Sequence, residues 1–102
     1  MEQLTIPAEI RAQATVAAAV CYTLPSGRSY IVVQQADGCH AFVNRCPHRQ
    51  LPLDRNSHLS LTADQQLLIC SNHGARFDLR SGQCVAGPCR GKALQPVAVL
   101  AE

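Results

Sequence analysis

The sequence predicts an all-β fold, built as a small domain of short antiparallel sheets. Stretches rich in Val, Ile, Leu and Tyr, such as 29–35, alternate with Gly, Pro and Asp turn signals. The pair Asp37-Gly38 is a strong signal for a two-residue hairpin turn. With 102 residues, 47% of them hydrophobic and 16% charged, the chain has the size and composition of one ordinary globular domain. We therefore expect residues 1–102 to form a single domain.

The first elements follow from local patterns. A short strand is expected over 4–6, ended by Pro7. Residues 8–20 are ambiguous, because their alanines favour a helix while Thr15-Val16 favours a strand. We expect a short helical or irregular segment there, followed by a strand from about Thr15 to Thr23.

The next elements form hairpins. Pro25-Ser26-Gly27 predicts a turn, and the residues on either side of Asp37 predict two paired strands, over 29–35 and up to Val43. Further on, strands are expected over 66–69 and 75–79, with a turn at 80–82. The last strand is expected over 94–101, interrupted near Pro96.

Two short motifs carry the chemistry. Cys46-Pro47-His48 and Cys70-Ser71-Asn72-His73 each offer one thiolate and one imidazole, with 21 residues (49–69) between them. Sulfur and imidazole ligands suit zinc or an iron–sulfur cluster, and not calcium or magnesium, which prefer oxygen. Structural zinc sites usually pair Cys with Cys and His with His, so the mixed pairs favour a centre with two chemically different ends. A structural zinc site remains the alternative.

The residues around these ligands resemble the two cluster-binding boxes of Rieske proteins. The similar stretches are Cys46–Leu53 and Cys70–Asp78, and Gly87-Pro88-Cys89 is similar to the third, proline-containing loop that covers the cluster in that family. The resemblance implies one 2Fe-2S cluster per chain, held at the tips of two loops within about 44–91. It places Cys46 and Cys70 on the inner iron, and His48 and His73 on the outer one.

The resemblance also implies a low reduction potential. High-potential relatives place a Ser and a Tyr hydroxyl near the cluster just after the second His, whereas this chain has Ala75 and Phe77. Those side chains donate no hydrogen bond, so we expect the low end of the Rieske range of about −150 to +300 mV.

The expected function is that of a small stand-alone Rieske ferredoxin, a one-electron carrier between a flavin reductase and an oxygenase or similar terminal enzyme. It is not expected to be an enzyme by itself, because no mononuclear iron motif occurs in the 29 residues (74–102) after His73. Two alternatives stay open. One is a small Rieske subunit of a larger reductase, such as nitrite reductase, and the other is a zinc-stabilised interaction module.

Composition limits the partners. The formal charge is +2, the basic residues are scattered along the sequence, and aromatic residues make up 4% of the chain, so nucleic-acid binding is not expected. No apolar run long enough to span a bilayer and no signal peptide is evident, so we expect a cytoplasmic protein without membrane or small-molecule ligands.

The His and Cys residues outside the two motifs are not expected to bind the metal centre. His40 and His58 are interpreted as surface histidines. Four further cysteines are interpreted as free thiols, with Cys89 also a candidate part of the third loop: Cys21, Cys39, Cys84 and Cys89. A Cys84–Cys89 disulfide is the alternative for that pair. Arg49 and Arg76, beside the two boxes, are candidates for a docking rim.

Overall fold

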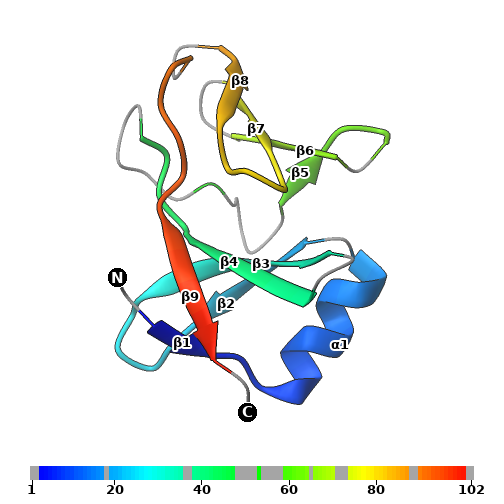
Figure 1. The fold of residues 1–102 in the computed structure, drawn as a ribbon, viewed down its shortest axis with the longest axis vertical. Helices are drawn as coiled ribbons and strands as arrows, with labels where there is room; N and C mark the ends of the chain where they lie inside the picture. The colour runs from blue at the N-terminus through cyan, green and yellow to red at the C-terminus, as the bar shows by residue number, and fades with distance from the viewer. Residues whose placement is uncertain are drawn as a thin grey trace. The chain divides into compact units, whose positions relative to one another are not determined.

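The computed structural model describes residues 3–17, 19–35, 38–47, 53, 59–64, 66–70, 74–87 and 90–100 (Figure 1). The chain divides into two compact units. The terminal unit comprises 1–43 and 96–102, and the central unit comprises 44–95. Each unit is built on one β-sheet, and the described part of the chain contains one short helix. The all-β prediction is therefore confirmed.

The terminal unit contains a five-stranded sheet in the order β1-β9-β4-β3-β2. Its strands are β1 (Gln3–Thr5), β2 (Ala19–Thr23), β3 (Ser29–Gln35), β4 (Gly38–Val43) and β9 (Pro96–Leu100). The neighbours β2–β3, β3–β4 and β4–β9 are antiparallel, whereas β1 pairs with β9 in parallel. The first and the last strand thus run side by side in one sheet (Figure 1).

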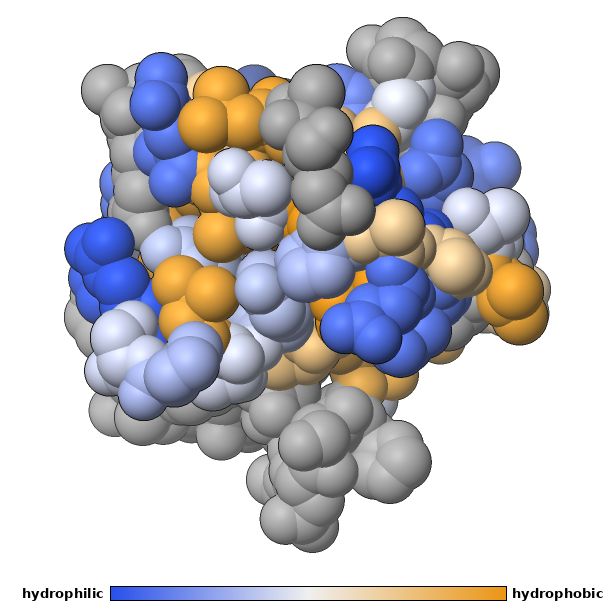
Figure 2. Space-filling view, turned by 90° about the horizontal axis from the view of Figure 1, so that it is seen from below, coloured by the Kyte–Doolittle hydropathy of each residue, from blue (hydrophilic) through white to orange (hydrophobic). Residues whose placement is uncertain are grey.

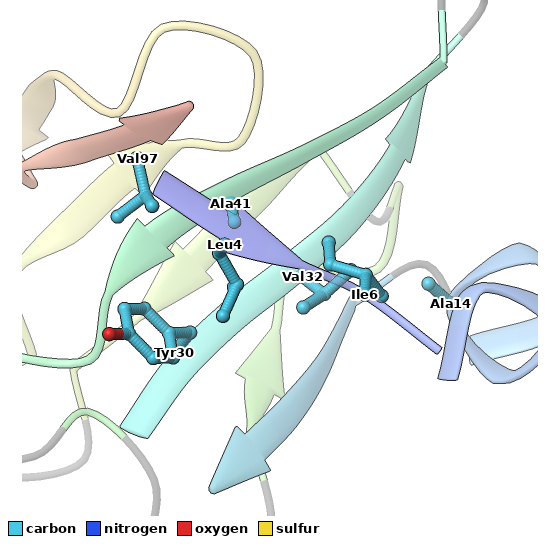
Figure 3. Close-up of a cluster of buried hydrophobic side chains, with 7 residues drawn as sticks. All are labelled: Leu4, Ile6, Ala14, Tyr30, Val32, Ala41 and Val97. Atoms are coloured by element: carbon cyan, nitrogen blue, oxygen red, sulfur yellow. The ribbon is translucent and has the colours of Figure 1, made fainter. Parts of the chain in front are cut away.

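The core of this unit collects apolar side chains from all parts of its sequence. Residues 30–33 of β3 are buried without alternation, as expected for a strand covered on both faces. On one face, Tyr30 and Val32 pack with side chains from β1, β4 and β9 (Figure 3). The full cluster is Leu4, Ile6, Ala14, Tyr30, Val32, Ala41 and Val97. Burying a large apolar side chain of this kind contributes about 1.5–3 kcal/mol.

Helix α1 (Ala8–Ala17) covers β2 and β3. Its first turn is closed by hydrogen bonds from the N–H groups of Ile10 and Arg11 to the Pro7 carbonyl, at 3.0 and 3.1 Å. Ala14 is fully buried against the sheet, whereas Val16 is 87% exposed. The helix therefore forms because alanine-rich sequence presents a narrow apolar stripe to the sheet, and β-branched Thr15 and Val16 are tolerated on its outer side.

Several sequence-based boundaries need correction. The helix continues to Ala17 and β2 starts at Ala19, so the strand expected from Thr15 was placed too early. Gln35 pairs with Gly38, which makes Gly38 the first residue of β4 rather than part of the turn. Pro96 begins β9 instead of interrupting it, since a strand's first residue can lack an N–H group. Asp37 and His58 lie outside the described residues.

The central unit contains a four-stranded antiparallel sheet in the order β5-β6-β7-β8. Its strands are β5 (Ser60–Leu61), β6 (Leu67–Ile69), β7 (Arg76–Asp78) and β8 (Cys84–Ala86). Phe77 pairs with Leu68 on one side and with Cys84 on the other, and all three are buried. The β7–β8 pairing shifts register between Arg76 and Phe77. The strands at 67–69 and 76–78 confirm the sequence prediction, whereas β5 and β8 were not predicted.

A small side-chain network stabilises the turn between β5 and β6. The Thr62 hydroxyl donates to the Asp64 carboxylate at 2.5 Å, and the Gln66 N–H donates to the same oxygen at 3.1 Å. These two hydrogen bonds, the Thr62 bond above all, lower the pKa of the Asp64 carboxyl below its usual 3.8. Because the folded-state pKa is lowered, the stabilisation is present above pH 3.8 and is lost as the pH falls through the lower value.

This network predicts a measurable shift in titration. NMR titration of the Asp64 side chain should give a midpoint below 3.8 in the wild type, and Thr62→Val should move that midpoint upward because the largest contribution is removed. Equal midpoints in the two proteins would contradict this assignment.

Exposed apolar residues are few among the described residues. The large ones are Val16, Val85 and Leu100. On the face shown in Figure 2, apolar side chains (orange) lie among hydrophilic ones (blue). Isolated exposed apolar residues of this kind are normal on protein surfaces. In the described ranges, no helix has the length and apolar character needed to cross a bilayer.

Candidate metal centre

The first predicted box begins where β4 ends. Asn44 and Cys46 follow the strand directly and are both buried, with only 1% of Cys46 exposed. The Leu53 N–H, at the far end of the box, donates to Asn44 Oδ1 at 2.7 Å, and Leu53 is itself buried. The ends of the 44–53 segment are therefore tied together next to the cysteine.

The second predicted box is closed in a similar way. Cys70 follows β6 and is 1% exposed. Its N–H donates to the Ala75 carbonyl at 2.7 Å, and its carbonyl accepts from the Gly74 N–H at 3.0 Å. Gly74 has a φ of +73°, a value that glycine adopts without strain. Cys70 is thus joined by two backbone hydrogen bonds to Gly74 and Ala75, directly before β7.

The third predicted loop packs on the second at its base. Gly87 has a φ of +93°, and a Cβ placed on it would lie 2.8 Å from the Ala75 Cα. The Arg90 N–H donates to the Gly87 carbonyl at 3.3 Å. Only glycine permits this close backbone approach, so the third loop is anchored at Ala75, within the second box.

The structure describes two of the four predicted ligands. Cys46 and Cys70 lie buried at the start of their loops, and His48 and His73 lie outside the described residues. Among the residues that are described, no three His, Cys, Asp or Glu side chains form a group that could hold a metal ion. The two cysteines nonetheless fit a cluster, since buried thiols at the start of loops closed by hydrogen bonds are where thiolate ligands sheltered from water would lie.

The other described cysteines make contacts outside the boxes. The Cys84 thiol donates to the Ala86 carbonyl at 3.2 Å, and Cys21 Sγ lies 3.2 Å from Ser29 Oγ. The Cys39 thiol donates to Gln34 Oε1 at 3.0 Å. Burial raises the pKa of Cys39, and the Arg11 charge opposes this more weakly. None of these three cysteines forms a disulfide with another described residue. Cys89 lies outside the described residues, and His40 is half-buried on β4.

Comparison with known protein families identifies the family of this chain. Residues 8–100 match the family described as "Rieske [2Fe-2S] domain". The chain belongs to the Rieske family. It therefore binds a Rieske 2Fe-2S cluster and acts in electron transport, and the zinc alternative is set aside. Among curated proteins, no sequence matches the chain.

Two kinds of solved structure resemble this Rieske protein. The ferredoxin of carbazole 1,9a-dioxygenase from Nocardioides aromaticivorans IC177 is 25% identical, with a TM-score of 0.57, covering 78% of this chain and 71% of the ferredoxin. The terminal oxygenase of carbazole 1,9a-dioxygenase from Novosphingobium sp. KA1 is 20% identical, with a TM-score of 0.63, covering 84% of this chain. The matched region spans about a quarter (24%) of that oxygenase, whose likeness shows the fold alone.

Two residues of the Rieske site were missed or undervalued in the sequence. Asn44 was not singled out, although a polar residue at the end of an apolar strand, two positions before a predicted ligand, is a usable signal. Gly87 was assigned to the third loop by resemblance, but its packing on the second box was not predicted. Its contact with Ala75 joins segments far apart in sequence, and no local pattern reveals such a contact.

Asn44 leads to a prediction about how firmly the Rieske cluster is held. Asn44→Ala removes the acceptor of the Leu53 N–H in a buried setting, which costs about 1–3 kcal/mol. We expect the cluster's visible absorption to decay about tenfold faster in urea. Each 1.4 kcal/mol removed from the free energy of opening the first loop raises the population of the open loop about tenfold.

The control removes a comparable bond elsewhere. Thr62→Ala takes away the hydroxyl that accepts the Leu67 N–H at 3.2 Å, in the turn between β5 and β6. Its decay rate should stay near that of the wild type. If the cluster absorption decays equally fast in Asn44→Ala and Thr62→Ala, the hypothesis that Asn44 holds the first box closed is wrong.

Proposed function

We propose that this Rieske protein carries single electrons from a flavin reductase to an oxygenase or similar terminal enzyme, and that residues 1–102 act as one functional domain. The observation that carries the proposal is the likeness to a ferredoxin of a dioxygenase system, which extends over 78% of this chain and 71% of the ferredoxin. Because the match covers most of both chains, the Rieske domain that they share makes up most of that ferredoxin, which fits a proposed carrier function for this chain.

The proposed ligands are Cys46 and Cys70 on the inner iron, and His48 and His73 on the outer iron. The burial of both cysteines supports the inner assignment, because their thiolates would be kept from water and from oxidants. The loops that begin at these cysteines are each tied by a backbone or side-chain hydrogen bond. When bound, a Rieske cluster takes up and releases one electron.

The chain's own groups in this proposal hold the ligands and exclude water. Asn44 and the Cys70–Ala75 hydrogen bond keep each loop closed at its base, so that the position of each cysteine changes little between oxidation states. Gly87 allows the third loop to seat against Ala75. A preorganised site of this type keeps the structural rearrangement that accompanies electron transfer small.

A low potential is part of the proposal. Ala75 and Phe77 are both fully buried, and neither has a hydroxyl to donate to a cluster sulfur or a cysteine sulfur. Potentiometric titration followed by EPR should place the midpoint near the lower end of the range of about −150 to +300 mV. A midpoint above roughly +150 mV would contradict it.

The second candidate is a Rieske part of a larger catalytic assembly, either an oxygenase or a reductase such as nitrite reductase. The observation behind it is that the same fold, aligned over 84% of this chain, makes up only 24% of the terminal oxygenase, so such a domain also occurs within a larger protein. In that case the electron acceptor would be a site in the same assembly and not a separately diffusing enzyme.

Electron transfer between separate proteins distinguishes the two candidates. The oxidised holoprotein is mixed anaerobically with NADH and a catalytic amount of a flavin reductase, and then with a Rieske oxygenase from which its own ferredoxin has been removed. A carrier should be reduced by one electron per chain over many reductase turnovers and then be reoxidised by the oxygenase. A protein that accepts and passes electrons only when a co-purifying catalytic subunit is bound would support the second candidate instead.

A further inference from the structure

The charges of the chain are divided unequally between the two units. Of the nine basic residues, only Arg11 and Arg28 belong to the terminal unit, and the other seven belong to the central unit. The central unit has three acidic residues, Asp54, Asp64 and Asp78, and the terminal unit has the remaining four of seven. The central unit is therefore +4 and the terminal unit −2. Basic residues that look scattered along the sequence are thus gathered in the unit that holds the cluster boxes.

Within the central unit, one exposed arginine stands directly beside each of the three loops. Arg45 directly precedes Cys46, Arg76 directly follows Ala75, and Arg90 follows the third loop. We call these three residues the loop arginines. All three are exposed, although their neighbours Cys46 and Ala75 are buried. A fourth arginine, Arg49, belongs to the first box and lies outside the described residues.

Two of the loop arginines flank the same backbone contact. Arg76 pairs with Ala86 in the β7–β8 ladder, and the next residue, Gly87, packs on Ala75. The Arg90 N–H donates to the Gly87 carbonyl. The second and third loops therefore meet at their bases with an arginine leaving each of them. By contrast, Arg80 belongs to the turn at the other end of β7, where the Asp78 carboxylate accepts from its N–H at 2.7 Å.

We infer that the loop arginines form a docking surface for a carboxylate-rich face of the redox partner protein. The inference rests on the proposed function, because it assumes that a separate protein approaches the cluster loops. A guanidinium group presents a planar fork of donors that matches a carboxylate, and it keeps its charge at all physiological pH values. Opposite charges on two approaching surfaces raise the association rate by about 10 to 1,000-fold at low salt.

A protein partner fits these charges better than the other polyanions. Aromatic residues on which bases stack make up only 4% of the chain, and the loop arginines come from three separate segments rather than from one basic helix or ribbon. Recognition of an anionic membrane generally uses four to eight basic residues in one run, and the sequence contains no such run. Three dispersed arginines around a redox centre suit a compact acidic protein surface.

The test compares two triple variants with the same change in charge. The loop variant is Arg45→Gln, Arg76→Gln and Arg90→Gln. The control variant is Arg11→Gln, Arg28→Gln and Arg80→Gln, which removes three charges elsewhere in the chain. The probe is a reduced, acidic plant-type ferredoxin, whose potential of about −400 mV makes electron transfer to any Rieske centre favourable. Stopped-flow mixing gives the second-order rate constant from low to high ionic strength, and calorimetric titration of the oxidised proteins gives the Kd.

The wild-type rate constant should fall steeply with ionic strength. At low salt the loop variant should be slower by about tenfold and nearly independent of salt, with a correspondingly weaker Kd, whereas the control variant should stay within about twofold of the wild type. Equal losses in both variants, or a salt-independent wild-type rate, would overturn the docking surface. Binding to anionic vesicles or duplex DNA that is lost only in the loop variant, with an unchanged ferredoxin rate, would also overturn it.

The same samples separate this inference from the proposed function. Each protein is first reduced with dithionite and examined by EPR. If the protein accepts one electron but the rate constant and the Kd are the same in the loop variant and the control variant, the docking surface alone is refuted. A protein that accepts no electron refutes the carrier function on which it rests.

Discussion

Alanine in place of Cys70 or Cys46 is expected to leave the purified protein with less than about a tenth of the wild-type iron and acid-labile sulfide. Each substitution removes one of the two thiolates assigned to the inner iron, and no other described thiol takes part in either box. Because cluster binding and folding of the two loops depend on one another, the visible absorption and the reduced-state EPR signal should disappear together.

The matched control is Cys84→Ala. Cys84 is also a buried cysteine of the central unit, but its thiol donates to the Ala86 carbonyl within β8. Its loss should leave about two irons per chain, as in any 2Fe-2S protein. Full iron and sulfide in Cys70→Ala, or an equal loss in Cys84→Ala, would show that the cluster is bound by other residues.

Gly87→Ala is expected to have the second-largest effect, through the third loop. The substitution places a Cβ 2.8 Å from the Ala75 Cα, at a φ of +93°. The left-handed backbone alone costs about 1–2 kcal/mol for a non-glycine residue, and overpacking costs a further 1–3 kcal/mol. Since the clash is with backbone, it can be relieved only by moving the loop away from the second box.

Gly91→Ala separates the two contributions. Gly91 has a φ of +92°, and a Cβ added to it would have no atom within 4 Å. It therefore bears the backbone cost without the clash. We expect the cluster absorption in mild urea to decay about tenfold faster in Gly87→Ala than in Gly91→Ala, since 1.4 kcal/mol is a factor of ten. Equal decay rates would mean that the contact between Gly87 and Ala75 does not protect the cluster.

The sequence predicts best those elements whose pattern is local. The strand over 29–35 matches β3 residue for residue, because an unbroken run of Tyr, Ile and Val can be read without knowing its neighbours. The strand leading into Cys70 is found for the same reason. The cysteines of the two boxes could be recognised because a mixed pair of ligands is a rare pattern.

Elements created by pairing could not be predicted in this way. β5 has only two residues and β8 only three, and each exists because it pairs with a stronger neighbour, β6 or β7. The parallel pairing of β1 with β9 joins Gln3 to Ala98, and nothing near either residue indicates it. The boundary between α1 and β2 was missed because Ala14 extends the helix by packing into the core, a tertiary effect that outweighs the propensity of Thr15 and Val16.

The functional site divides along the same line. The proposed ligands can be picked out from the sequence, whereas the contacts that close the loops around the two cysteines cannot. The hydrogen bond from Leu53 to Asn44 and the contact of Gly87 with Ala75 connect residues nine and twelve positions apart through the folded loops. The gathering of basic residues in the central unit likewise appears only when the chain is divided as it folds.

Pulsed EPR of the reduced protein labelled with 15N-histidine tests the mixed ligation most directly. Two strongly coupled histidine nitrogens should be detected in the wild type, and replacing His40, a histidine on β4, by glutamine should leave both couplings unchanged. A reduced cluster without histidine couplings would show that all of its ligands are cysteines, and would contradict one imidazole from each box.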